Sequence, residues 1–353
     1  MSQPLYLPQP LNLGDIFYTM SLATLRRNMV ITMILVFGML FVIISVITYY
    51  FDIGTYTTLV LVLLFIVFQW LISPYIVSIS TDLQYLKKGE NPFLENMVEG
   101  MARKSGIPVP RIAVVPDVTP NAFVFGRTIS SATLAVHDGL LRNFRPEEIE
   151  AVVAHEIGHL KHKDVIVMTL ASVVPLVASV FYRSTFWTRG RRKDAGSIAL
   201  VAAASFFVYL ISQLLVLYLS RSREYYADTY SAYLTGEPHN LRSALAKIAY
   251  GLSLSSKEST GLRAFYIGDP EKSKTEIRTI IEKKYEYDLD RDGILDEHEL
   301  ELAMQKEAER SPFGKADELF STHPSTFKRI LLLKRIEDEL DRGQLTGDIY
   351  RFI

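Results

Sequence analysis

The chain of 353 residues carries 38 basic and 39 acidic side chains, so its net charge is -1 and no basic excess indicates a nucleic-acid partner. The absence of cysteine excludes disulfides, thiolate metal ligands and a cysteine nucleophile. Hydrophobic residues make up 49% of the chain, which is high beside 22% charged residues and favours membrane spans.

Two uncharged runs near the N-terminus predict a transmembrane hairpin. Residues 29–51 and 55–73 each have close to the roughly 20 residues that a helix needs to cross the hydrocarbon core. Arg26 and Arg27 precede the first run, and the turn at 52–54 has no basic residue. The positive-inside rule therefore places the N-terminus, and the chain after the second run, in the cytoplasm. Buried core helices are the alternative interpretation.

Two further uncharged runs, 165–182 and 198–220, predict a second hydrophobic helical hairpin, although Pro175 interrupts the first of them. The loop between them is basic, with Arg183, Arg189, Arg191, Arg192 and Lys193. If both runs cross the membrane, this loop lies outside, against the positive-inside rule. A hairpin that dips into the bilayer or packs on a catalytic domain removes the conflict, and the sequence leaves both arrangements open.

The segment 145–164 contains a motif with the spacing of a metal site. Its apolar positions continue one face of a helix. His155 and His159 are one turn apart on that helix, about 6 Å along its axis, so both imidazoles can reach one zinc ion. Glu156 points beside the metal, where its carboxylate can take a proton from the attacking water. His162 lies about 10 Å from His155 along the axis, too far to share the ion. A helix with two merely polar histidines is the alternative.

A catalytic zinc needs a third protein ligand, and the best candidate follows the fourth apolar run. Glu224 and Asp228 are four residues apart and share one helix face. Glu224 can ligate zinc, while Asp228 can accept a hydrogen bond from a ligating imidazole. Taken alone, such a pair is more often a solvated helix face.

Both motifs, His155-Glu156-Ile157-Gly158-His159 and Arg223-Glu224-Tyr225-Tyr226-Ala227-Asp228, resemble the HtpX family of membrane-embedded zinc metalloproteases, relatives of the CAAX prenyl proteases. Residues 120–126 resemble the family's substrate-facing strand. Thr322-His323-Pro324, with Arg329-Ile330, resembles its C-terminal segment. The resemblance covers roughly residues 15 to 340, with one gap.

The resemblance implies a mainly α membrane protein, with four hydrophobic helices and a gluzincin-type α+β metallopeptidase domain. It implies one zinc ion per chain, with three ligands: His155, His159 and Glu224. Glu156 is then the catalytic base, and His323 helps to stabilise the oxyanion.

The same resemblance implies the kind of substrate and how it binds. It implies that a strand binds protein or peptide substrates by strand addition. The strand residues are Asn121, Ala122 and Phe123. The protein would degrade misfolded or membrane proteins as a multi-pass protein of the inner (cytoplasmic) cell membrane, with its active site on the cytoplasmic side.

Residues 288–299 match the twelve-residue EF-hand loop, and Gly293 stands where the loop turns sharply. The predicted calcium ligands are Asp288, Asp290, Asp292, the Ile294 carbonyl, Asp296 and Glu299. The loop has no counterpart in the family pattern and lies in the gap, at 253–315, so we expect an insertion. A solvated acidic turn is the alternative, because EF-hands normally occur in pairs and only one is visible.

The predicted division of the chain is a tail (1–28), a transmembrane hairpin (29–73), the first part of the catalytic domain (74–164), a second hairpin (165–220), the third-ligand region (221–252), the insertion (253–315) and the C-terminal part of the catalytic domain (316–353). The predicted function is a membrane-integrated zinc endopeptidase whose partners are substrates and the lipid bilayer. The alternatives are a non-catalytic zinc scaffold, which has no use for Glu156, and a calcium-responsive membrane adaptor.

Overall fold

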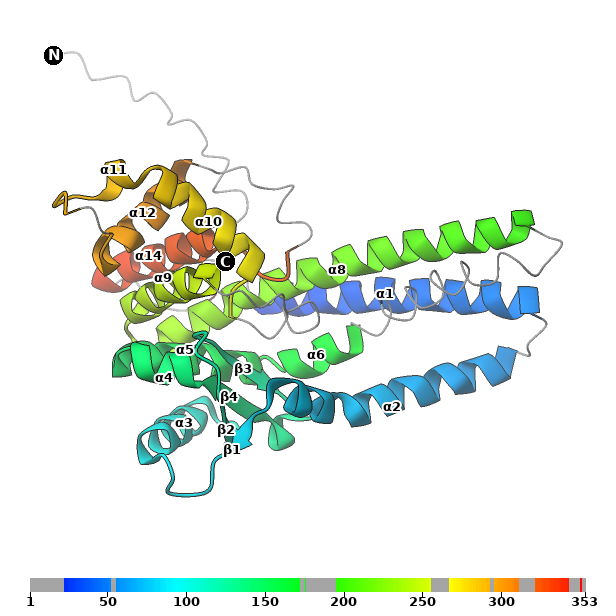
Figure 1. Ribbon diagram of the computed structural model, residues 1–353. Coiled ribbons are helices and arrows are strands. Elements are labelled where there is room, and N and C mark those ends of the chain that lie inside the picture. The colour runs from blue at the N-terminus through cyan, green and yellow to red at the C-terminus, as the bar shows by residue number, and fades with distance from the viewer. Residues whose placement is uncertain are drawn as a thin grey trace, which may run out of the picture.

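The computed structural model describes residues 22–51, 55–171, 175, 195–254, 267–292, 295–310, 321–342 and 350. Most of these residues are helical, as the sequence predicts, and a small sheet accompanies the helices. Three long helices, α1, α2 and α8, extend to one side of a body built from the sheet and shorter helices (Figure 1).

Both N-terminal apolar runs form helices. They are α1 (Leu22–Phe51) and α2 (Thr55–Thr81), which continues through Pro74. Large apolar side chains along both helices are exposed, among them Val30, Ile34, Phe41, Leu63, Leu64 and Phe68. An exposed apolar surface of this extent indicates contact with a membrane or another protein.

The fourth apolar run lies inside one helix of 41 residues, α8 (Ala195–Thr235), which continues through the third-ligand motif. The predicted boundary at residue 220 therefore falls within a continuous helix. By length and composition, Ala202–Thr235 is the one stretch of the described residues that is suited to crossing a membrane, beside two shorter apolar stretches, Arg27–Met39 and Trp70–Thr81.

The third run is described as α6 (Asp164–Ala171) and residue 175. The rest of it, and the basic loop at 183–193, lie outside the described residues. Four membrane spans therefore remain a prediction.

The sheet has four strands in the order β1-β2-β4-β3. They are β1 (Gln84–Tyr85), β2 (Arg111–Val115), β3 (Ala122–Phe125) and β4 (Thr133–His137). The β2–β4 pair is parallel and aligns Val115 with His137, whereas the other two pairs are antiparallel. Among the described residues β3 has a strand partner on one side only, so it forms an edge of the sheet next to the predicted zinc helix.

Shorter helices complete the body, packed on this sheet or on one another. They are α3 (Pro92–Ser105), α4 (Asp138–Asn143), α5 (Pro146–Lys161) and α9 (Pro238–Leu254), with a 3-10 turn at Ile129–Ser131. Glu148, fully buried on α5, accepts hydrogen bonds from Ser243 at 2.6 Å and Lys247 at 3.0 Å, both on α9. Burial raises the pKa of Glu148, but these bonds and those from Arg145 outweigh it and lower the pKa to about 2. A charged carboxylate thus joins α5 to α9.

The region predicted as an insertion contains α10 (Pro270–Glu282), α11 (Lys284–Tyr287) and α12 (Glu297–Arg310), and α14 (Thr326–Asp341) follows it. These helices share an apolar core with α9. Its buried members are Ala246, Ala249, Ile277, Ile280, Tyr287, Ala303, Met304, Phe327 and Ile330. The region therefore packs directly on the body, next to α9 and α14 (Figure 1).

We expect Gly139→Ala to destabilise the protein. A Cβ at this position of α4 would lie 2.0 Å from the carbonyl oxygen of Val118, and the Gly139 amide already donates to Asp117 at 2.9 Å. Such overpacking costs roughly 1–3 kcal/mol or more, so the melting temperature of the detergent-purified chain should fall by several degrees. Gly100→Ala is the control, because nothing lies within 4 Å of the added Cβ in α3. Equal melting temperatures for the two variants would contradict the expectation.

Candidate metal centre

Helices α5 and α8 meet closely at Gly158. A Cβ on Gly158 would lie 3.2 Å from the Cα of Ala227 and 3.3 Å from the Cβ of Tyr230, tighter than an ordinary contact. The Ser231 hydroxyl of α8 donates to the carbonyl of Ala151 on α5 at 2.7 Å. Because the glycine lets the backbones approach, the acidic motif of α8 lies against the histidine motif of α5.

Three buried side chains, His155, His159 and Glu224, converge at this contact. The Nε2 atoms of the two histidines are 3.2 Å apart. Glu224 places Oε2 at 3.6 Å from Nε2 of His155 and Oε1 at 3.5 Å from Nε2 of His159. A tetrahedral zinc with bonds of about 2.0–2.1 Å separates its ligand atoms by about 3.3 Å. The cluster therefore fits a metal site with the ligands that the sequence predicts.

Carboxylates lie behind both imidazoles. Asp228 has Oδ1 at 2.9 Å from Nδ1 of His155, and Asp164 has Oδ2 at 2.7 Å from Nδ1 of His159. A proton held at each Nδ1 leaves the lone pair of Nε2 for a metal. Asp228 was expected here, whereas Asp164 was missed. Its signal in the sequence is an acidic residue shortly after the zinc helix, which ends at Lys161.

Protons and metal compete for His155. Burial lowers its pKa, but the contacts with Asp228 and Glu224 outweigh this and raise the pKa to about 9 in the metal-free protein. Metal binding must displace that proton, so the affinity for metal decreases as the pH falls.

Two buried arginines balance the acidic residues. Arg329, 1% exposed, donates from Nε and Nη2 to Asp228 at 2.8 and 2.7 Å, and its Nη1 lies 3.5 Å from Oε2 of Glu224. Arg223 places Nε 3.0 Å from Oδ1 of Asp164. In the sequence, Arg329 belongs to the C-terminal segment that resembles the family, and no role was assigned to it. The structure shows that it orients the carboxylate behind His155.

Glu156 and His323 lie beside the cluster. Burial raises the pKa of Glu156, and the nearby charges of His159 and His155 act in the opposite direction. His323 is 4% exposed and has Nδ1 at 3.2 Å from Oε2 of Glu224. Its Nε2 is buried without a hydrogen-bond partner among the described residues. The Nδ1 atom of His323 is thus close to a metal ligand, while its Nε2 atom remains available for a hydrogen bond.

Ala122 and Phe123 belong to β3, and Asn121 directly precedes it. All three are buried, and Oδ1 of Asn121 accepts from the Ile267 amide at 2.9 Å. The Asn121 carbonyl accepts from the His137 amide at 2.9 Å. The Asn121 side chain thus holds the chain just before α10, and its predicted contact with substrate stays a prediction.

The EF-hand-like loop brings carboxylates of Asp288, Asp290 and Asp292 within 4.8 Å of one another. Glu299 accepts from the Leu289 amide at 2.6 Å and the Asp296 amide at 3.1 Å, so it closes the loop. The predicted ligand Ile294, with Gly293, lies outside the described residues.

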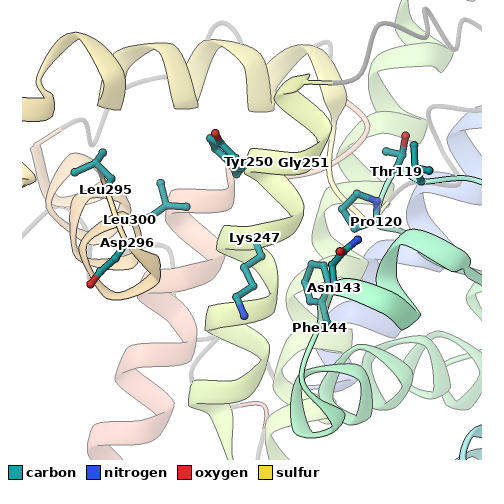
Figure 2. Close-up of a pocket in the computed structure, with 11 residues that line it drawn as sticks. Thr119, Pro120, Asn143, Phe144, Lys247, Tyr250, Gly251, Leu295, Asp296 and Leu300 are labelled. Carbon is teal, nitrogen blue, oxygen red and sulfur yellow. The ribbon is translucent and has the colours of Figure 1, made fainter. Parts of the chain in front are cut away.

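A pocket of about 580 Å³ lies between this loop and the segment before β3. Figure 2 shows Tyr250 and Lys247 of α9 between its two walls. One wall holds Leu295, Asp296 and Leu300, and the other holds Val118, Thr119, Pro120, Asn143 and Phe144. The EF-hand-like loop and the predicted substrate segment therefore border one cavity.

His162 is separate from the metal cluster. Its Nε2 lies 2.8 Å from the hydroxyl of Tyr350, and its ring packs edge-on against Tyr226 and Tyr230. Burial lowers the pKa of His162 to about 4. This neutral, packed imidazole agrees with its exclusion as a ligand.

Comparisons with known proteins agree with these motifs. The model of peptidase family M48 matches residues 88–337. A protease HtpX homolog of Methanothermobacter thermautotrophicus is 40% identical over 230 residues, which are 65% of this chain and 87% of the relative. Protease HtpX homolog 2 of Methanosarcina mazei is 32% identical over 326 residues, covering 90% and 96%. The crystal structure of S. mikatae Ste24p aligns with a TM-score of 0.43 and 21% identity over 72% of this chain and 65% of that one.

We expect Glu224→Ala to abolish zinc binding. The substitution removes one corner of the ligand triangle and leaves Arg329 and His323 facing a buried gap, so metal content should fall from about one ion per chain to near zero. Elemental analysis of the purified chain measures this. Glu237→Ala, on the exposed segment after α8, is the control and should keep its zinc. Full zinc content in the Glu224 variant would remove this residue from the ligand set.

Proposed function

The chain belongs to peptidase family M48, and on this premise we propose that it is a membrane-integrated, zinc-dependent endopeptidase. Membership makes it a protease of the metallopeptidase class. The observation that carries the finer proposal is the triangle of His155, His159 and Glu224, whose separations of 3.2 to 3.6 Å suit tetrahedral zinc. Glu156, on the same helix as both histidines, supplies the base that a zinc scaffold would not need.

Each residue then has a defined step. When bound, zinc supplies Lewis acidity for the scissile carbonyl and the attacking water. Glu156 takes the proton of that water and delivers it to the leaving nitrogen. His323 donates from Nε2 to the developing oxyanion. Because water attacks directly, no acyl-enzyme forms.

We place the protein in the cytoplasmic (inner) cell membrane as a multi-pass protein, with its site on the cytoplasmic side. The exposed apolar side chains of α1 and α2 and the long apolar stretch of α8 support contact with lipid. Arg26 and Arg27 support the orientation. Because α8 carries both an apolar stretch and Glu224, the site lies near the membrane surface, where misfolded or membrane-inserted proteins are accessible substrates.

Substrates would bind as an added strand on β3. Its edge has no strand partner among the described residues, and it lies next to α5. Hydrogen bonds to the substrate backbone do not depend on the identity of the side chains, so cleavage would tolerate many sequences. Removal of damaged proteins requires such tolerance.

A second proposal concerns the EF-hand-like loop, which we infer to bind calcium and to modulate the peptidase. Three clustered carboxylates and Asp296 offer the oxygen ligands that calcium prefers. The loop borders the same pocket as Thr119 and Pro120, which lie across it just before Asn121. Ordering of the loop by calcium would therefore reach the segment that leads into β3.

Glu156→Gln should abolish proteolysis and retain zinc. The amide keeps the shape of the side chain but cannot act as a base, so kcat on an unfolded protein substrate should fall roughly 10²–10⁴-fold. Glu150→Gln, exposed on the same helix, is the control and should keep full activity. A zinc chelator should abolish proteolysis by both the wild type and the control. Undiminished cleavage by the Glu156 variant would refute its role as base.

Calcium should bind the full chain with a dissociation constant no tighter than about 10⁻⁵ M, because a single unpaired loop lacks support from a second one. Calorimetry on the detergent-purified protein measures this, with Glu299→Gln as the variant that loses binding. The absence of heat and of thermal stabilisation at several millimolar calcium would leave the loop as a solvated acidic turn.

A further inference from the structure

We propose that α10 and the residue before it position His323 for catalysis, through hydrogen bonds that Asp269 and Glu276 accept from the segment 321–325. This inference rests on the proposed peptidase function. It makes the first helix of the insertion part of the support for the active site, and it makes both acids positioning residues that touch neither zinc nor substrate.

Asp269 holds the start of the segment. It directly precedes α10, is 3% exposed, and lies with Oδ2 at 3.2 Å from the Ser321 hydroxyl and 3.4 Å from the Thr322 hydroxyl. Its Oδ1 accepts from the Lys272 amide at 3.4 Å, and its carbonyl accepts from the Ser273 amide at 2.8 Å. One carboxylate thus joins the N-terminus of α10 to the two residues before His323.

Glu276 holds the other end. It lies two turns further along α10, is 6% exposed, and accepts a hydrogen bond of 2.6 Å from the hydroxyl of Ser325. Ser325 is also the residue that precedes the first turn of α14. Asp269, just before α10, and Glu276, on α10, therefore hold the segment on both sides of His323.

Helix α8 supplies a third anchor, because Arg221 donates from Nη1 to the carbonyl of Ser321 at 2.8 Å. Within the segment, the Ser321 hydroxyl lies 2.9 Å from the carbonyl oxygen of His323. Pro324 has a fixed φ and disfavours helical backbone at the preceding His323. The internal conformation is thus restricted, and the position of the whole segment depends on its anchors.

The position of the segment matters because His323 has Nδ1 at 3.2 Å from a metal ligand, Glu224. A donor to an oxyanion works only when its distance is correct to a few tenths of an ångström, and small misplacements reduce rates strongly. A shift of the segment along α10 would carry the Nε2 atom away from the reacting carbonyl, while the zinc ligands stay in place.

Burial of these acids costs desolvation free energy, which apolar side chains at the same positions would not. Burial raises the pKa of Glu276 to about 7, even though its hydrogen bonds with Ser325 and Thr326 and the charge of Lys272 act to lower it. An apolar side chain would fill the same space without this penalty. A directional acceptor for one hydroxyl is what the carboxyl group provides and an apolar group does not.

The test compares Glu276→Ala, Glu276→Gln and a matched control, Glu282→Ala, in the zinc-loaded full chain. Glu282 is on the same helix, and its side chain is 62% exposed. We expect Glu276→Ala to lower kcat about tenfold or more, with KM within about twofold and zinc content unchanged. Glu276→Gln keeps the acceptor and should restore most of kcat, and the control should match the wild type.

A double variant separates positioning from general stability. In a His323→Ala background, adding Glu276→Ala should lower kcat no further, because the residue acts only through His323. An equal loss in both backgrounds, normal kcat in Glu276→Ala, or loss of zinc would overturn the inference. If Glu276→Ala fails to fold, Ser325→Ala removes the other half of the same hydrogen bond and is judged by the same criteria.

The activity of the wild type separates failure of the proposed function from failure of this inference. A wild type without chelator-sensitive cleavage would overturn the proposed function, and this inference with it. An active wild type with an unaffected Glu276→Ala variant would overturn the inference alone.

Discussion

The close contact of α5 with α8 at Gly158 is the constraint on which the metal cluster depends. Helix axes normally stay 8–10 Å apart, at a distance set by the side chains between them. With a glycine opposite Ala227, the backbones approach until Glu224 reaches the two histidines. Every other part of the centre builds on this contact, since one helix supplies the imidazoles and the base, and the other supplies the third ligand and the carboxylate behind His155.

Such a site concentrates charge where water is scarce, and that charge must be balanced. Asp164, Glu224 and Asp228 are buried acids, and Arg223 and Arg329 are their buried cationic partners. Pairs of this kind add little net stability, because desolvation offsets their attraction, but removal of one partner is costly. They fix which carboxylate oxygen faces which imidazole nitrogen. A divalent cation at the cluster would complete the balance with positive charge at the point where the ligand atoms converge.

The sequence identified the candidate site residues that stand in recognisable motifs, and missed those that only tertiary contacts bring to the site. His155, Glu156 and His159 follow from helical spacing, and the positions of Glu224, Asp228 and His323 agree with the motifs. The contacts of Asp164 and of Arg329, 101 residues beyond Asp228, depend on how helices pack. The same holds for the hydrogen bond that Asn121 accepts from the Ile267 amide, and for the insertion, whose packing on α9 no local pattern reveals. The contact of Asn121 with substrate stays a prediction. The apolar helices α1 and α2 cover the two runs that the sequence predicts, because length and lack of charge are local properties, while four spans stay a prediction.

The continuity of α8 has a consequence for the evolution of the protein. Val216, on its apolar part, shares a small core with Val36 of α1, and Glu224 lies eight positions further along the same helix. One residue inserted between them would rotate the ligand by about 100° and move it by about 1.5 Å. The insertion would turn the carboxylate out of the cluster, even though the chemistry of every side chain is intact. Insertions and deletions in this stretch are therefore compatible with metal binding only when they add or remove nearly whole helical turns.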